Sequence, residues 1–176
     1  MAMTPHVRKF ALTVHVSSSV GWLGAVAAFL ALAVAGLSSQ DAQIVRASYL
    51  MMEVIGWFVL VPLSLASLLS GLVQALGTRW GLFRHYWVLF KLLITVLSTT
   101  VLLIYMQTLS YLSGVAAETT LSSGDLGRLQ TGSPVLHAGV GLLLLLVATT
   151  LSVYKPQGLT PYGWRKQVEQ RTGSQP

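Results

Sequence analysis

The chain contains no cysteine, and very few of its residues carry a charge. Without cysteine it has no disulfide, no thiolate metal site, no iron–sulfur cluster and no cysteine nucleophile. Charged residues make up 9% of the sequence, whereas a soluble domain carries about 25%. Hydrophobic residues make up 53%. The composition therefore excludes an ordinary soluble domain.

The charged residues are separated by long runs that contain none. Four such runs, of 31, 25, 26 and 26 residues, cover Phe10–Gln40, Val54–Thr78, Leu92–Ala117 and Leu129–Tyr154. A helix that crosses a bilayer needs about 20 predominantly apolar residues. We therefore predict an all-α polytopic membrane protein, a single domain over 1–176 with four transmembrane helices in an antiparallel bundle. The spans are expected near 10–36, 47–76, 86–112 and 134–154, followed by a short basic tail at 155–176.

The side of the membrane follows from the basic residues. The N-terminal tail, the second loop and the C-terminal tail carry eight Lys and Arg residues, against two in the other loops. Basic loops stay in the cytoplasm, so we expect both termini to be cytoplasmic and the protein to lie in the cell inner membrane. The net charge of +6 is split among these short flanks. No basic patch suits a nucleic acid, and the bilayer is the expected partner.

Three local features bear on the first span, the second span and the connection before the fourth. Arg8, Lys9 and the Ala33–Ala35 segment resemble a cleavable signal peptide, but a 31-residue run far exceeds the usual 7–15 apolar residues, so we predict a mature helix. Pro62 removes one backbone donor, which predicts a kink in the second span. The segment 113–133 is rich in Gly, Ser and Thr and is predicted to be a flexible connection.

The depth of each polar residue follows from the helical rise of about 1.5 Å per residue. His15 and Lys91 lie about 12 Å and 10 Å toward the cytoplasm from the middle of their spans. Glu53 and His137 lie about 10 Å and 12 Å toward the outside. These positions form two layers. Glu53 and Lys91 are too far apart to form a salt bridge, so each needs its own partner.

Ionisable groups within a membrane cost roughly 2.5–3.5 kcal/mol each, which makes a functional site the first hypothesis. Simpler explanations remain open for each residue. The stem of Lys91 can carry its amine toward the interface, and Glu53 can meet interfacial water. His15 and His137 can be neutral rings bonded to a hydroxyl or a carbonyl, and His85 can be interfacial.

Haem is the first cofactor to consider in a four-helix membrane bundle that contains histidines. A pair of haems needs two ligands in each layer, and the sequence lacks them. A single haem held by one histidine is compatible with the residues present. The predicted cofactor-binding residues are His15 as first ligand, His137 as second, and Lys91.

A metal ion is the alternative. Zinc is weakly supported, because only His137 and Glu53 share a layer. Copper suits His137 together with an outer methionine such as Met52, because thioethers bind Cu(I). The predicted metal ligands are therefore His137, Glu53 and Met52. Trp22, Tyr105 and His85 are further candidates for either site.

Short motifs resemble known membrane families. The segment His15-Val-Ser-Ser-Ser-Val-Gly-Trp-Leu-Gly24, the stretch Trp87–Leu92 and the closing Tyr154-Lys155-Pro156-Gln157-Gly158 resemble small four-helix bacterial membrane proteins of unknown function. The first two are also distantly similar to copper-resistance D-type membrane domains and to the haem-associated membrane protoporphyrinogen oxidase. The oxidase resemblance implies that His15 is a haem ligand and Lys91 its functional partner.

Three functions are therefore predicted. The first is a membrane protein that binds haem or a metal between its helices, for electron transfer or oxidoreductase chemistry. The second is a non-catalytic accessory subunit that docks another membrane protein. The third is a proton-coupled carrier that acts as a homodimer. The sequence leaves open whether the protein is an enzyme.

Overall fold

A computed structural model describes residues 4–77, 81–118, 122–156 and 158–172. Within these residues the chain is helical and contains no β-strand. Its elements are α1 (Pro5–Ser38), α2 (Ala42–Ile55), the π-helical turn η1 (Gly56–Leu60), α3 (Val61–Gly77), α4 (Tyr86–Ala117), α5 (Ser123–Leu129), α6 (Ser133–Tyr154) and α7 (Pro161–Thr172). Residues 157 and 173–176 of the predicted tail lie outside the described residues.

Four helical stretches are long and apolar enough to cross a membrane: Pro5–Ser38, Ala42–Gly77, Tyr86–Ala117 and Ser123–Tyr154. The second is one continuous rod made of α2, η1 and α3. The prediction of a multi-pass helical membrane protein is therefore confirmed. The first and third helices extend several residues beyond their predicted limits. A helix continues past its apolar run until it reaches a residue whose backbone angles are no longer helical, such as Ser39 after the first helix.

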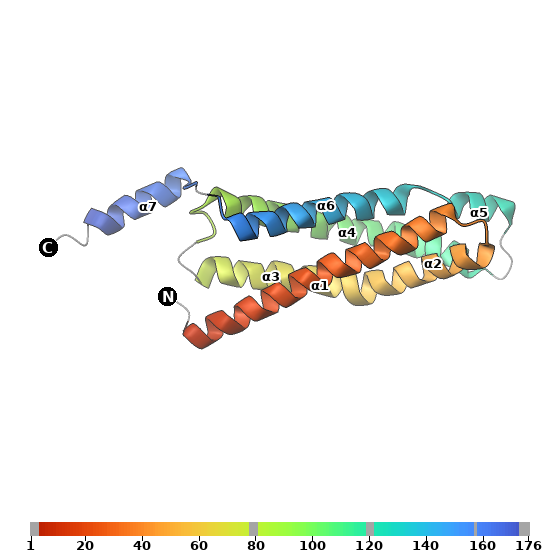
Figure 1. Cartoon of the computed structure of the whole chain (residues 1–176), viewed down its shortest axis with the longest axis horizontal. Helices are drawn as coiled ribbons and strands as arrows, with labels where there is room; N and C mark the ends of the chain where they lie inside the picture. The colour runs from red at the N-terminus through yellow and green to blue at the C-terminus, as the bar shows by residue number, and fades with distance from the viewer. Residues whose placement is uncertain (1–3, 78–80, 119–121, 157, 173–176) are drawn as a thin grey trace.

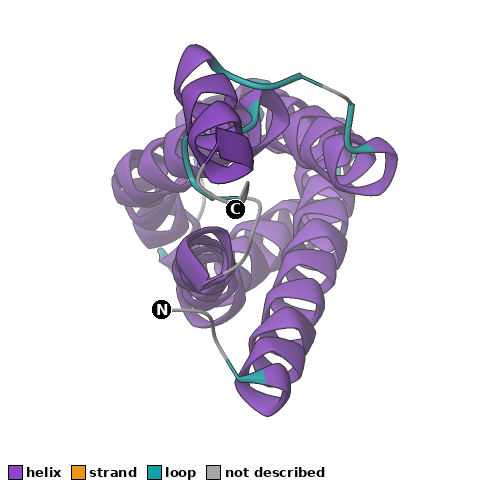
Figure 2. Cartoon of the chain, turned by 90° about the vertical axis from the view of Figure 1, so that its left-hand side faces the viewer, coloured by secondary structure: helices purple, strands orange, loops and turns teal. Residues whose placement is uncertain are grey.

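The long helices lie side by side around one axis (Figures 1 and 2). α1 packs against the α2–α3 rod and against α6, and α4 packs against the same two neighbours. The start of α1, the end of α3, the start of α4 and the end of α6 meet at one end of the bundle, beyond which α7 extends (Figure 1). α2 and α5 lie at the other end, called here the α2–α5 end.

The core is densest toward the α2–α5 end. Tyr49, Met52, Met106 and Leu109 are at most 1% exposed there. The Tyr49 hydroxyl donates a hydrogen bond to the carbonyl of Leu129, which ties α2 to α5. Along α3, by contrast, the buried residues are serines: Ser64, Ser67 and Ser70. Serines are thus the buried residues along α3, although Ser48 and Ser113 are also buried toward the α2–α5 end.

The connection over residues 113–133 is more regular than predicted. α4 continues through Ser113 to Ala117, and α5 is a further helix within the segment. The Ser122 hydroxyl accepts from the backbone of Asp125, whose carboxylate accepts from the backbone of Ser122. This reciprocal capping box satisfies two backbone donors and begins a helix. Composition alone suggested a flexible loop there, and that prediction is wrong.

The second span contains a π-helical turn shortly before Pro62, and the predicted kink stays a prediction. The Val61 amide donates to the carbonyl of Gly56, five residues earlier. Gly56 also allows α4 to approach, because a Cβ at this position would lie 2.6 Å from Cε of Met106. Single π-helical turns within membrane helices often accompany functional sites.

The segment after α6 is fastened to the residues that precede α4. The Tyr86 amide donates to the carbonyl of Gly158 over 3.2 Å, and the Thr160 amide donates to the carbonyl of Arg84 over 3.0 Å. The Thr160 hydroxyl accepts from the Gly163 amide at 3.0 Å, which caps the start of α7. The base of α7 is thereby attached to the bundle.

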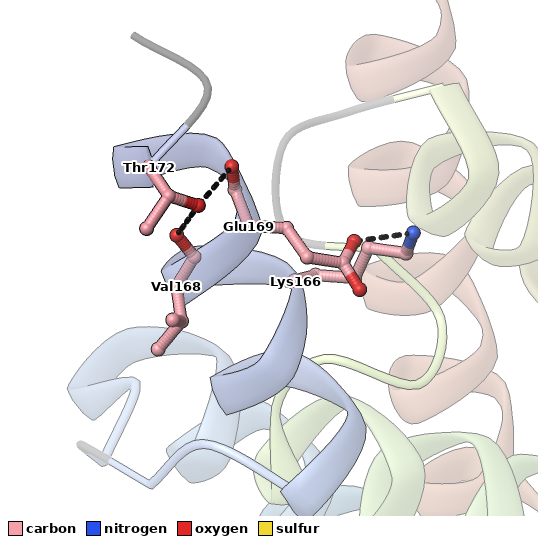
Figure 3. A network of polar contacts seen from close by, with 4 residues as sticks. All are labelled: Lys166, Val168, Glu169 and Thr172. Carbon is pink, nitrogen blue, oxygen red and sulfur yellow. Dashed lines mark hydrogen bonds and ion pairs between the residues drawn. The ribbon is translucent and has the colours of Figure 1, made fainter. Parts of the chain in front are cut away.

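α7 itself is a short polar helix whose side chains bond to one another and to its own backbone (Figure 3). Lys166 Nζ donates to the Glu169 carboxylate at 2.9 Å, and the Thr172 hydroxyl donates to the carbonyls of Val168 and Glu169. The hydrogen bond raises the pKa of Lys166 and lowers the pKa of Glu169. Both side chains are exposed, so the pair contributes little to stability.

The attachment of α7 predicts that one of two glycine substitutions disrupts it and the other does not. In Gly163→Ala the new Cβ would lie 2.3 Å from the carbonyl oxygen of Arg84, so the segment must shift at a cost of about 1–3 kcal/mol. We expect the Thr160 and Tyr86 amides to exchange with solvent about tenfold faster or more, as measured by hydrogen exchange. Gly158→Ala is the control, because its nearest neighbour lies at 3.6 Å. Equal exchange rates in the two variants would contradict this attachment.

Candidate functional site

Two cavities lie between the helices. The first, called the His15 cavity, has a volume of about 120 Å³ and lies between α1, α3 and α4, where His15, Ser67, Gly71, Gln74, Trp87, Lys91 and Thr95 line it. The second, called the His137 cavity, has a volume of about 350 Å³ and is lined by Trp22, Leu60, Ser98, Tyr105, Met106, His137 and other apolar side chains of α1, α4 and α6. The two histidines line different cavities, so they cannot ligate one group together.

His15 is held by the backbone of α3. Its Nδ1 lies 3.1 Å from the Ser67 carbonyl oxygen and 3.1 Å from the Ser70 hydroxyl. Because a carbonyl only accepts, the bond to Ser67 requires the hydrogen on Nδ1. In the neutral ring, Nε2 then has its lone pair free to accept a hydrogen bond or to bind a metal.

Gly71 makes room for this ring. A Cβ at residue 71 would lie 3.1 Å from Cε1 and 3.5 Å from Nδ1 of His15. Ser67, Ser70 and Gly71 were absent from the sequence-based candidates. Their spacing of three and four residues was a usable signal, since it places all three on one face of α3.

Lys91 lines the same cavity as His15, as their shared depth predicted. Its amine lies 5.9 Å from the centre of the Trp87 ring, a cation–π contact near the outer limit of such interactions. Within the described residues, neither a hydrogen bond nor an ion pair reaches this amine. The cavity is thus lined by both a half-buried ammonium and an imidazole ring.

His137 is held in a similar way by its own helix. Its Nδ1 lies 2.9 Å from the carbonyl oxygen of Ser133, so Nδ1 carries the hydrogen and Nε2 has a free lone pair. The ring stacks on Tyr105, with centroids 4.0 Å apart and planes 19° apart. The Ser133 hydroxyl donates to the Tyr105 hydroxyl over 3.4 Å. Ser133 was absent from the sequence-based candidates, although it lies four residues before His137.

The His137 cavity opens between α4 and α6. Leu97 and Val101 of α4 and Leu136 and Val140 of α6 line it, and all four are 43–63% exposed. In a spanning bundle this face meets lipid, so an apolar molecule can reach the cavity from the membrane. Trp22 closes the cavity on the α1 side, with only 3% of its surface exposed.

Ser98 adds a buried hydroxyl without a partner. Only 8% of the residue is exposed, it lines the His137 cavity, and no described residue accepts from or donates to its oxygen. A buried hydroxyl without a hydrogen bond costs about 1–3 kcal/mol. Small-molecule sites are typically apolar with a few such polar groups.

The remaining predicted residues line neither of these two cavities. Glu53 is half-buried on α2, and Met52 is fully buried in the core. His85 precedes α4 and pairs with Leu159 through a β-bridge. Among the described residues, no three His, Asp or Glu side chains gather where they could hold a metal ion. The predicted set of His137, Glu53 and Met52 is therefore not assembled around a cavity.

No protein-family model, curated protein or solved structure matches the chain. The resemblance to small membrane proteins of unknown function therefore stays a prediction. The two cavities are therefore the basis on which a function can be proposed.

The position of the His15 ring predicts the effect of adding one methyl group. We expect Gly71→Ala to displace the imidazole by a few tenths of an ångström, because the new Cβ would meet the ring at 3.1 Å. The bond from Nδ1 to Ser67 should weaken. Nitrogen NMR of histidine-labelled protein reports this as a shift of the His15 Nδ1 signal.

Gly24→Ala is the matched control, because a Cβ there meets no atom within 4 Å. Its spectrum should equal that of the wild type. If the His15 signal moves in neither variant, the ring is not held against Gly71.

Proposed function

We propose that the protein binds a redox cofactor of the membrane, with haem as the first candidate, in the His137 cavity. The observation that carries this proposal is the orientation of His137. Its Nδ1–H is bonded to the Ser133 carbonyl at 2.9 Å, and its Nε2 is left for a metal at the larger of the two cavities. Metal-binding histidines usually donate their other ring nitrogen to a carbonyl or carboxylate in this way.

The residues around His137 suit a flat apolar group. The walls are aliphatic and aromatic, the mouth opens toward lipid between α4 and α6, and the Ser98 hydroxyl offers one hydrogen bond inside. Met106 lines the cavity, but its sulfur lies against Gly56, where a Cβ would be 2.7 Å from Sδ. The arrangement therefore favours ligation by one histidine.

Each residue has a distinct task in this proposal. His137 holds the iron through Nε2, Ser133 fixes the orientation of its ring, and Tyr105 supports the ring by stacking. Trp22 and the aliphatic walls exclude water, which keeps the surroundings of the cofactor apolar. A bound haem would supply one-electron transfer. His15, which the sequence ranked first as a ligand, faces a cavity only about a third as large.

The proposed orientation places both termini in the cytoplasm and adjacent spanning helices antiparallel, in the inner membrane. The eight-to-two distribution of basic residues supports it. In this orientation the His137 cavity lies in the outer half of the bilayer. Electrons would therefore be exchanged near the outer surface.

A visible absorption spectrum tests the proposal. Protein purified in mild detergent from haem-supplemented cells should show a Soret band, and His137→Ala should reduce it by about tenfold or more. His15→Ala should keep the band. His6→Ala is the control for a general effect of losing a histidine, because His6 is exposed at the start of α1.

Other outcomes would change the proposed cofactor or overturn the proposed function. Copper in place of iron by elemental analysis, lost in His137→Ala, would retain the site and change its metal. The absence of both a Soret band and a bound metal would overturn the proposal. A partner membrane protein that copurifies in fixed ratio with His137→Ala and wild type alike would then favour an accessory subunit.

A further inference from the structure

Among the described residues, no acidic side chain forms an ion pair with the Lys91 ammonium. The sequence has five acidic residues, and none of them lines the His15 cavity. Their positions are Asp41, Glu53, Glu118, Asp125 and Glu169. Glu53 lies on α2 and Asp125 on α5, while Asp41 precedes α2 and Glu118 follows α4. All four therefore belong to the α2–α5 end of the bundle, away from the start of α4 (Figure 1). The last is paired with Lys166 on α7.

The surroundings of Lys91 make an anion necessary and favour its approach. An unpaired charge at this depth costs several kcal/mol, and the contact with Trp87 at 5.9 Å offsets only part of it. Lys155 ends α6 at the same end of the bundle and adds positive charge there. No described residue supplies that anion, so an anion from outside the chain can take this position.

His15 specifies which anion fits. Its Nδ1–H is occupied by Ser67 and the residue lines the cavity. This leaves Nε2 to meet an anion, either with a lone pair or, in the protonated ring, with a hydrogen. A phosphate monoester balances the charge in both cases. With neutral His15, its monoanion pairs with Lys91 and its remaining O–H donates to Nε2. With protonated His15, its dianion accepts from both cations.

A phosphate diester or a carboxylate fits less well. Either one carries a single negative charge and no O–H at neutral pH. Beside neutral His15 it would place an acceptor oxygen against the Nε2 lone pair, and beside protonated His15 it would leave one positive charge unbalanced. Discrimination between phosphate types therefore depends on His15, whereas attraction of any anion depends on Lys91.

We propose that the His15 cavity binds a phosphate monoester, held by Lys91 and His15. The apolar part of the lining, Leu68, Leu72, Leu82 and Leu92, suits the start of an acyl chain, so phosphatidic acid is one source of this headgroup. Free phosphate is the other source. The inference concerns a different cavity from that of the proposed cofactor and does not depend on it.

Spin-labelled lipids test this inference on the full chain in phosphatidylcholine vesicles. The measured quantity is the fraction of labelled phosphatidic acid, a monoester, or phosphatidylglycerol, a diester, that the protein immobilises. We expect a preference of about fivefold for phosphatidic acid over phosphatidylcholine. Lys91→Gln should abolish it. Lys9→Gln, which removes the same charge from an exposed site at the start of α1, should leave it unchanged.

A second variant keeps the test decisive if Lys91→Gln does not fold. His15→Phe fills the same space without the ring nitrogens, and Lys91 stays in place. It should remove the preference for phosphatidic acid over phosphatidylglycerol and keep the preference of both over phosphatidylcholine.

Competition with inorganic phosphate shows whether the headgroup alone is enough for binding or the acyl chain also contributes. If phosphate displaces labelled phosphatidic acid, the headgroup alone suffices for binding, and if it does not, the acyl chain contributes. Either result supports a monoester site. Equal immobilisation of the two anionic lipids by the wild type, or the same loss in Lys9→Gln as in Lys91→Gln, would overturn the inference.

Discussion

The bilayer offers no water to satisfy polar groups, so each buried donor and acceptor of a spanning helix must find its partner within the protein. Most side chains in this bundle meet that demand locally. Thr95, Thr149 and Ser152 donate to carbonyls four residues earlier, and Tyr49 donates to the carbonyl of Leu129 across the core. Two groups that line cavities find no such partner among the described residues: the Ser98 hydroxyl and the Lys91 ammonium. Each lines the same cavity as a histidine whose Nδ1 is already bonded to a carbonyl.

This constraint connects the fold to its two proposed sites. α1 and α4 contribute to both cavities, while α3 completes one and α6 completes the other. The same bundle can therefore hold a polar headgroup at the serine-rich end and an apolar cofactor further along. Because the histidines line different cavities, loss of one ligand should leave the other site intact.

The sequence predicted the helices well and the sites only in part. Four charge-free runs predicted four spans, because each helix must by itself supply enough apolar residues to cross the bilayer. The depths derived from the helical rise correctly placed His15 and Lys91 in one layer. In the structure α1, α3 and α4 enclose both residues in one cavity. The same reasoning grouped His137 with Glu53, but depth does not say which helices are neighbours. Glu53 lies on α2 and His137 on α6, and both helices pack against α1 and α4.

Other features depend on contacts that no local pattern reveals. The π-helical turn at Gly56 accompanies the close approach of Met106, and the Ser98 hydroxyl has no partner among the described residues.

In the proposed site His137 alone ligates the cofactor. Pulsed EPR of the haem-loaded protein with nitrogen-15 histidine measures the number of coordinated imidazoles. We expect coupling from a single imidazole, lost in His137→Gln and kept in His15→Gln. Coupling from two imidazoles, or coupling that persists in His137→Gln, would contradict it.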